Sequence, residues 1–326
     1  MELADIARWT PVRLTVERPQ PTVDWGDLRG MRFEEPFFGQ TIARWAGMEP
    51  PRGLVRTGLQ ELAALDSEPS LDPAGFIFHL SRCGSTLLSR LLGTVPGVVV
   101  VSEPEPLNAL LEADPELVDP EAQILVLRLL VRALGRIRFG DERRYILKLS
   151  SWNIRRFELF RRAFPATPWV WVDREPVEIM ASILAGPPGW MQLRQHPRRA
   201  EHLFGLDPFE VSAMAPEEFC ARALAAMAES VRDAPDAPLL VDYRELPDAI
   251  WARAAPHFGL TLAEAEIDRI CEEARYYAKD PVRRPFTADR SVKQAVPRTV
   301  RDLAEGIVGP VHAELAARRA AQFMRE

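Results

Sequence analysis

The sequence predicts an α/β fold in which a central parallel sheet of about five strands carries helices on both faces. Two observations carry this prediction: short apolar runs of strand length recur along the chain, and segments with helical spacing separate them. Strands covered on both faces are apolar throughout, and their alternation with helices is typical of three-layer α/β domains. The five apolar runs cover residues 75–80, 98–102, 145–149, 169–173 and 238–243.

The intervals between these runs, and the end of the chain, have the pattern of helices. Helical spacing covers residues 121–137 and 154–164, and another helix begins near Pro176, a residue type favoured in the first turn. Residues 262–279 and the chain from residue 298 onward are also mostly helical in pattern. Because ligands bind beyond the carboxyl ends of parallel strands, we expect the functional groups just after the first four apolar runs.

Two segments stand outside this alternation. Residues 1–72 show little period, and we interpret them as an N-terminal extension that packs on a main domain of residues 73–326. Residues 186–209 are rich in proline, glycine and basic side chains, so we expect a long loop or lid there. Both segments are candidates for shaping a ligand pocket.

Composition and charge exclude several classes of protein. The net charge of −6 gives no overall basic field, so we expect no binding to nucleic acid, and any anion site must be local. The first residues lack the pattern of a secretory signal, and no apolar run is long enough to span a membrane. The three cysteines, Cys83, Cys220 and Cys271, form no zinc motif or disulfide framework, which indicates a reducing, cytoplasmic location and no structural metal.

The strongest local signal is a strand–turn–helix segment, HLSRCGSTLLSRLL, that begins at His79. Gly84 lets the backbone approach a ligand closely, and Ser85 and Thr86 offer hydroxyl and free N–H groups where the helix begins. Arg82 adds a positive charge. The segment lacks the lysine and the spacing of a Walker A phosphate loop. A purely structural interpretation, in which Ser85 caps the helix and Arg82 is solvated, also stays open from these residues alone.

Residues 81–92, SRCGSTLLSRLL, resemble the 5′-phosphosulfate loop of the sulfotransferases that use 3′-phosphoadenosine-5′-phosphosulfate (PAPS). Ser81 and Cys83 depart from the proline and serine that are usual in this family. The resemblance implies a P-loop-like fold, PAPS as the donor and no metal. It also implies that the turn binds the nucleotide, through Arg82, Cys83, Gly84, Ser85, Thr86 and Leu87.

A second segment, VWVDREPVEIMASIL at residues 170–184, resembles the 3′-phosphate motif of the same family. Arg174 and Ser182 fall on its phosphate-binding positions, about two helical turns apart. The alternative for Arg174 is an ion pair with Glu175 or Glu178. A third segment, LLVDYRELPDAIWARAAPHFGL, is similar to a family stretch that supports the fold, and we assign no chemistry to it.

Glu103, Lys148 and Arg82 are the candidate catalytic residues. Glu103 directly follows the second predicted strand, and we expect it to be the general base that takes the acceptor proton, with Glu105 in reserve. The alternative is that both acids are solvated. Lys148 ends the third strand, where the resemblance places a lysine facing the bridging oxygen, and with Arg82 it is expected to stabilise the leaving phosphate. Otherwise Lys148 pairs with a nearby acid. His79, inside the first strand, is interpreted as a core histidine.

Taken together, these residues predict a sulfotransferase that moves a sulfuryl group from PAPS to a hydroxyl or amine by a single in-line displacement. We expect the acceptor to be a small molecule or a glycan, with residues 1–72 and 186–209 shaping its pocket. Two alternatives stay open, which are a P-loop kinase or other phosphotransferase and a non-catalytic nucleotide-binding protein.

Two further expectations concern single residues. Cys83 would lie beside Arg82 and near a helix N-terminus, so we expect it to react with alkylating reagents faster than Cys220 or Cys271. A basic run near the end of the chain is a weaker candidate for reaching the 3′-phosphate, and its members are Arg283, Arg284, Arg290 and Lys293.

Overall fold

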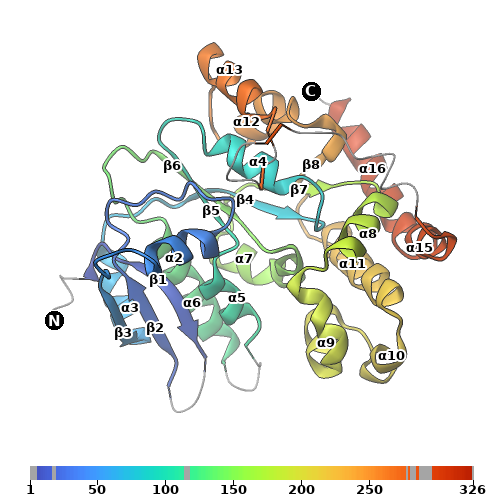
Figure 1. The fold of residues 1–326 in the computed structure, drawn as a ribbon, viewed down its shortest axis with the longest axis horizontal. Helices are drawn as coiled ribbons and strands as arrows, with labels where there is room; N and C mark the ends of the chain where they lie inside the picture. The colour runs from blue at the N-terminus through green and yellow to red at the C-terminus, as the bar shows by residue number, and fades with distance from the viewer. Residues whose placement is uncertain are drawn as a thin grey trace.

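The computed structural model contains two sheets, a parallel one that forms the centre of the molecule and an antiparallel one near the N-terminus (Figure 1). The structure describes residues 6–16, 20–113, 118–276, 278–279, 284–285 and 296–324.

The central sheet confirms the predicted α/β class and all five predicted strands. Its order is β5-β6-β4-β7-β8, and every neighbouring pair is parallel. The strands end together, since Ser102 pairs with Lys148 and Asp173 pairs with Asp242 in register. Side chains that follow the strands therefore meet at one edge. The bounds are β4 Pro73–His79, β5 Val98–Ser102, β6 Arg144–Lys148, β7 Trp169–Asp173 and β8 Leu239–Asp242.

Helices cover both faces of this sheet, as the alternating pattern predicts. In Figure 1, α4 and α13 lie on one side of the sheet, and α6 and α7 lie on the other. The helices that follow the strands are α4 Ser85–Leu92, α5 Glu105–Leu111, α6 Pro120–Leu134, α7 Phe157–Ala163, α8 Pro176–Ala185 and α11 Pro216–Arg232. Towards the C-terminus lie α12 Ala255–His257, α13 Glu264–Glu273, α15 Arg298–Leu303 and α16 Gly309–Phe323. Short 3₁₀ helices are η1 Leu65–Ser67, η2 Ser151–Arg156 and η4 Tyr243–Glu245, and π-helical turns are η5 Ile250–Ala254 and η6 Ala304–Val308.

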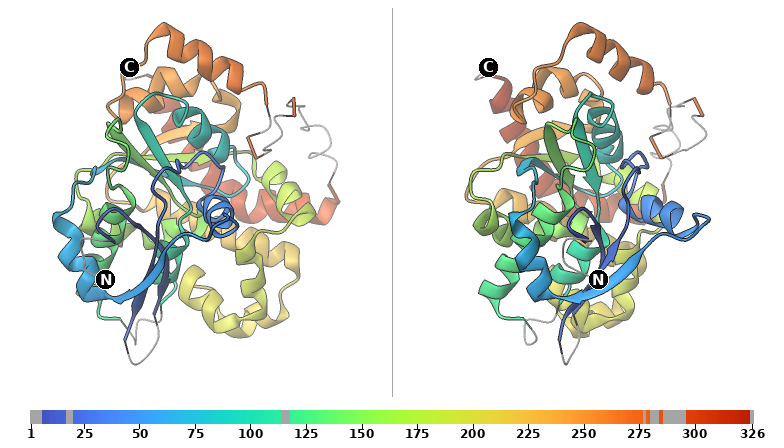
Figure 2. Two further views of the ribbon diagram at one scale, coloured as in Figure 1. Left: turned by 60° about the vertical axis from the view of Figure 1, so that its left-hand side comes forward. Right: turned by 90° about the vertical axis from the view of Figure 1, so that its left-hand side faces the viewer.

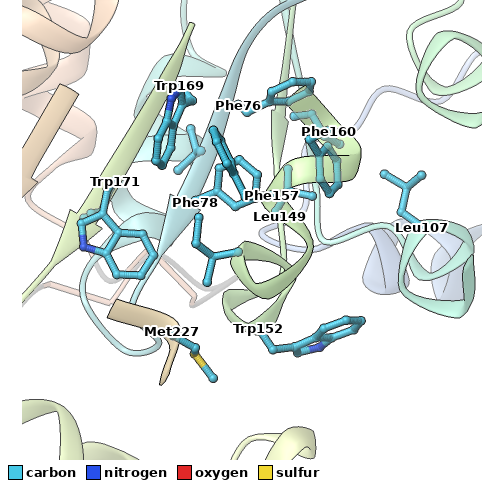
Figure 3. Close-up of a cluster of buried hydrophobic side chains, with 14 of the residues drawn as sticks. Phe76, Phe78, Leu107, Leu149, Trp152, Phe157, Phe160, Trp169, Trp171 and Met227 are labelled. Carbon is cyan, nitrogen blue, oxygen red and sulfur yellow. The ribbon is translucent and has the colours of Figure 1, made fainter. Parts of the chain in front are cut away.

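Aromatic side chains fill the core between the sheet and α7 (Figure 3). Phe78 of β4 meets Phe160 and Trp169 edge to face, with ring centroids 5.5 and 5.7 Å apart. Phe157 lies against the Trp169 ring at 4.3 Å. Such pairs add directional preference to the burial of large apolar surfaces. The rigid core holds the strand ends, and with them the loops that follow, in fixed positions.

The N-terminal residues form a sheet that the sequence analysis did not predict. Strands β1 (Thr10–Thr15), β2 (Thr22–Gly26) and β3 (Leu54–Gly58) pair antiparallel in that order, and β1 contacts α5 and α6. Figure 2 shows this sheet in two further views. Strand β3 has no fully buried residue, so its sequence lacks the alternation of apolar and polar residues that marks a half-buried strand. Two helices complete the segment, α2 (Phe38–Ala46) and α3 (Leu59–Ala64).

Arg136, just after α6, ties this segment to the main core. Its buried guanidinium donates hydrogen bonds to the carbonyls of Trp9 (3.1 Å) and Leu65 (3.2 Å), and it lies 5.0 Å from the ring of Trp25. Trp25 and Val23 of β2 belong to the same buried cluster as the central strands. The N-terminal segment therefore packs on the main core, and its proposed part in shaping an acceptor pocket stays a prediction.

The expectation of a long loop over residues 186–209 is wrong. The segment forms the 3₁₀ helix η3 (Gly189–Gln195) and helix α9 (Pro197–Phe204), and Pro208 begins α10 (Pro208–Ala213). Pro197 and Pro208 occupy first turns, where a missing N–H costs nothing, so here proline starts helices instead of marking a loop. The buried side chains of Trp190 and Phe204 anchor the segment, with ring centroids 5.8 Å apart. Within the described residues, no helix is both long and apolar enough to cross a bilayer.

Candidate active site

A cavity of about 1160 Å³ opens at the carboxyl edge of the parallel sheet, where the strand pattern predicts a ligand. Residues that follow each of the first four strands line it, namely Arg82, Glu103, Ser150 and Arg174, and Tyr243 follows the fifth. Phe37 from the N-terminal segment and residues between 188 and 199 close the other walls. This volume exceeds that of a usual small-ligand site, so the cavity has room for two ligands side by side.

The turn after β4 is built to bind an anion. Gly84 adopts a left-handed conformation with φ of 90°, and α4 begins at the next residue, with Ser85 and Thr86 buried. A Cβ at Gly84 would lie 2.5 Å from Cδ2 of Tyr243, so both the conformation and the space require glycine. The first N–H groups of a helix have no partner within it, and together with the helix dipole they attract negative charge.

Arg82 is held in the turn by its own backbone and by α8. Its φ is 57°, which is uncommon for a residue with a side chain. The Nη2 group donates a hydrogen bond of 2.6 Å to the carbonyl of Gly186, just after α8. Its Nε is buried and has no partner among the described residues. The guanidinium is therefore fixed at the cavity wall with a donor still unused.

Glu103 and Lys148 form an ion pair at the ends of β5 and β6. Lys148 is fully buried, and its ammonium contacts the Glu103 carboxylate and lies 5.3 Å from the ring of Phe37. The Glu103 backbone has φ of 54°, and its N–H donates to the Lys148 carbonyl at 2.7 Å. Among the described residues, Arg82 and Glu103 are the two non-glycine residues with positive φ. Strained backbone of this kind concentrates at functional sites, and both examples lie in this cavity.

His79 is a site residue that the sequence analysis missed. Its Nε2 lies 3.0 Å from the carbonyl oxygen of Leu149 and 3.6 Å from Oε1 of Glu103, while its buried Nδ1 has no partner among the described residues. Burial, followed by the charge of Lys148, lowers the pKa of His79 to about 4, so the imidazole is neutral at pH 7. Its position as the last residue of β4, at the carboxyl edge, was the signal that could have placed it in the site.

The Glu103 carboxylate is ionised near neutral pH. Burial opposes ionisation, but the neighbouring Lys148 ammonium and the contact with His79 hold the pKa of Glu103 well below its usual range. Glu105, the reserve candidate, is exposed at the start of α5 and does not line the cavity. The structure therefore brings Glu103, and not Glu105, to Lys148 and Arg82.

The second motif places Arg174 and Ser182 on the same cavity, in a wall beside the turn. The Nε group of Arg174 donates to Oε2 of Glu178 at 2.6 Å, and its guanidinium lies 4.1 Å from the Tyr243 ring. Arg174 thus pairs with Glu178, as the alternative expected, but the pair is buried and not at the surface, and binding of a phosphate by Arg174 stays a prediction. Tyr243 and Arg244, which follow β8, also line the cavity, and the sequence analysis gave them no chemistry.

Cys83 does not have the reactive thiol that the sequence analysis expected. The side chain is fully buried under the turn, and Sγ donates a hydrogen bond of 3.1 Å to the Val172 carbonyl. Burial raises the pKa of the thiol to about 12 and outweighs the helix N-terminus. Cys220 is likewise buried, whereas Cys271 is partly exposed. In the C-terminal basic run, Arg283, Arg290 and Lys293 lie outside the described residues, and Arg284 does not line the cavity.

One acidic cluster lies behind the strand ends, where Asp173, Asp242 and His312 point at one another. Arg319 neutralises these acids. Its guanidinium lies 3.3 Å from Asp173, 3.2 Å from Asp242 and 3.3 Å from Glu245. A guanidinium this close supplies the positive charge that buried carboxylates need. We therefore interpret the cluster as a structural ion-pair network that joins α16 to the sheet.

Comparison with known proteins returns sulfotransferases among solved structures. One from Mycobacterium avium shows 13% identity and a TM-score of 0.45 over 76% of this chain and 78% of that one. One from Alicyclobacillus acidocaldarius shows 16% identity and a TM-score of 0.44, and the match covers 76% of this chain and 96% of that one. A mouse sulfotransferase complexed with PAP shows 12% identity and a TM-score of 0.38, and the match covers 76% of this chain and 86% of that one.

No family model matches the sequence, and no curated protein matches it. At identities and TM-scores this low, function has to be argued from the residues of the site itself.

Proposed function

We propose that this protein transfers a sulfuryl group from PAPS to a hydroxyl or amine of an acceptor. The observation that carries the proposal is the buried Lys148–Glu103 ion pair, which lies beside an anion-binding turn that has no Walker lysine. A carboxylate that can take a proton thus lines the cavity, in contact with an ammonium that is proposed to meet a leaving oxygen. This pairing suits the transfer of a group from a phosphate to an alcohol.

The donor would lie across the strand ends. The turn of residues 81–87 is proposed to hold the 5′-phosphosulfate through the N–H groups that begin α4, the hydroxyls of Ser85 and Thr86, and Arg82. Arg174 and Ser182 are proposed to hold the 3′-phosphate, with the Tyr243 ring supporting the guanidinium. The rest of the cavity, towards Trp152 and α9, is left for the acceptor.

The resting ion pair supports an exchange of partners during the reaction. Lys148 holds the pKa of Glu103 low, so in the free protein the carboxylate is a weak base. A donor whose bridging oxygen draws the ammonium away would raise the basicity of Glu103 at the moment an acceptor arrives. The neutral His79 ring lies beside the carboxylate and adds no competing positive charge.

The proposed chemical step is a single displacement at sulfur. The acceptor oxygen or nitrogen forms a bond to sulfur as the bond from sulfur to the bridging phosphate oxygen breaks. The acceptor proton goes to Glu103, and the electron pair of the broken bond stays on the phosphate of the departing nucleotide, beside Lys148 and Arg82. Preorganised positive charge at a leaving oxygen is usually a large part of catalysis.

A P-loop kinase is the less favoured alternative. Phosphate transfer relies on a Walker lysine and a bound Mg²⁺, and the turn of this chain has neither the lysine nor the spacing. A non-catalytic nucleotide-binding protein gives no reason for two strained residues to line one cavity, one of them paired with a fully buried lysine.

Donor choice can be tested by thermal shift and by transfer. PAPS or its desulfo product should raise the melting temperature by mass action, and ATP with Mg²⁺ should do much less. Radiolabelled sulfate from PAPS should then appear in molecules of a metabolite extract, each heavier by one sulfate. Equal stabilisation by ATP with Mg²⁺, accompanied by phosphate transfer, would contradict the proposal and favour the kinase.

A further inference from the structure

Lysine is rare in this chain, and two of its lysines lie near one aromatic ring of the cavity wall. The sequence has 41 lysine and arginine residues, and the lysines among them are Lys148, Lys279 and Lys293. The Nζ atoms of Lys148 and Lys279 lie 5.3 and 5.6 Å from the centre of one ring, that of Phe37. An ammonium is a compact charge with three donors, whereas a guanidinium is a flat fork. A chain that otherwise uses arginine thus places two compact charges at one ring.

The charges around the cavity leave Lys279 available to a ligand. Most cations there are paired with carboxylates: Lys148 with Glu103, Arg174 with Glu178, Arg199 with Glu112 and Arg244 with Asp242. Among the described residues that line the cavity, Arg82 and Lys279 form no ion pair. Two unneutralised cations in one cavity favour an anionic ligand.

Lys279 is positioned by the same helix that forms the anion-binding turn. Arg90 of α4 donates a hydrogen bond of 3.0 Å to the carbonyl of Ala278, the preceding residue. The Phe37 ring supports the ammonium from the side of the N-terminal segment, as cations lie favourably over aromatic faces. Although Lys279 is exposed overall, the cavity wall removes part of the hydration of its ammonium, and the charges of Arg82 and Lys148 add to this, so the pKa of Lys279 falls to about 8.

We propose that Lys279 binds the sulfuryl group of the donor and stabilises it during transfer. This inference rests on the proposed function. The sulfuryl oxygens carry negative charge before, during and after the displacement, so a cation at their side assists binding and transfer without itself gaining or losing a bond. The role differs from contact with the 3′-phosphate, because Lys279 lies near the same Phe37 ring as Lys148, whereas Arg174 lies over the ring of Tyr243.

The test compares ligands that differ only in the sulfuryl group. Affinities of PAPS and of its desulfo product would be measured by calorimetry for the wild type, Lys279→Met and Lys279→Arg. Lys279→Met should weaken the affinity for PAPS by about tenfold or more, the loss expected for a hydrogen bond to a charged group. The same variant should change the affinity for the desulfo product by less than about twofold. Lys279→Arg should recover part of the PAPS affinity. Arg275→Met, an exposed cation outside the cavity, is the matched control and should change neither.

The pH dependence gives a second, independent measure. Below pH 8 Lys279 is charged in the free protein, and above it a proton must be taken up on binding, so the preference for PAPS over the desulfo product should fall as pH rises through about 8. Lys279→Arg should remove this fall, since arginine stays charged. If Lys279→Met lost equal affinity for both ligands, the residue would be assigned to a phosphate and the inference would be overturned. No loss of affinity for either ligand would also overturn it. A wild type that binds neither ligand would instead overturn the proposed function itself.

Discussion

The two ends of the cavity hold their positive charges in opposite ways. At the turn after β4, Arg82 reaches only a backbone carbonyl, and Lys279 has no described carboxylate partner. At the end formed by β7 and β8, Arg174 is paired with buried Glu178 and Arg244 with Asp242. Besides the paired Lys148, an anion at the first end meets Arg82 and Lys279, which form no ion pair among the described residues, whereas an anion at the second end meets cations that carboxylates already compensate. We therefore expect the first end to dominate catalysis, and the second to combine binding with stability.

The largest expected effect lies at the first end, at the proposed base. Glu103→Gln should leave PAPS binding intact and reduce turnover by about 10²–10⁴-fold, the usual contribution of a general base. Nucleotide product can be followed by chromatography, with affinity measured separately. Glu105→Gln is the matched control, because Glu105 is exposed and outside the cavity. Should Glu105→Gln be the inactive variant, the reserve assignment from the sequence would stand instead.

The next effect separates the two ends by stability. Arg174→Ala should lower the free energy of unfolding by about 3–5 kcal/mol, because it breaks a buried ion pair. Arg82→Ala should cost only about 0.5–1.5 kcal/mol, since it loses one hydrogen bond. Both variants should weaken the binding of PAPS by about 1.5–3 kcal/mol, the range for hydrogen bonds to charged groups.

Denaturant unfolding and calorimetry on both variants check this contrast. Glu178→Gln serves as a control for Arg174→Ala, because it removes the partner charge and keeps the side chain's size. Equal loss of stability in Arg82→Ala and Arg174→Ala would mean that the two ends do not differ as described.

A smaller effect concerns the pH dependence of stability at the first end. The folded-state pKa of His79 is lowered to about 4, so between pH 6.5 and 4 the unfolded chain binds a proton that the folded chain refuses. Stability should therefore fall as pH drops through this window, by on the order of 3 kcal/mol in total. His79→Gln should lose this dependence, and the difference between the two unfolding curves isolates it from other titrating groups. Parallel curves for the two proteins would argue against a neutral, buried His79.

The smallest effect is the order of cysteine labelling. Cys271 is partly exposed, whereas Cys83 and Cys220 are buried with pKa values raised to about 12. An alkylating reagent should therefore modify Cys271 first, with PAPS giving no protection at that position. Peptide mapping by mass spectrometry measures the order. Early labelling of Cys83 would show that the turn opens more than the buried geometry allows.

The sequence by itself determined the central sheet and much of the site. The five continuous apolar runs specify strands buried on both faces, and parallel strands bring their following residues to one edge. Arg82, Glu103, Lys148 and Arg174 were therefore placed together from local patterns alone, and the structure has all four at that edge.

Only the tertiary structure decided how these groups are paired and which distant residues join them. Whether Lys148 meets an acid depends on the register between β5 and β6, which no local pattern encodes. Phe37 and Lys279 are far apart in the sequence and come together because the N-terminal segment and the segment of Ala278 both lie beside α4. The expected reactivity of Cys83 failed for the same reason, since local charge favours a thiolate but the fold buries the sulfur. Burial and long-range contact are properties of the folded chain, so they decide pKa values and partners that sequence patterns leave open.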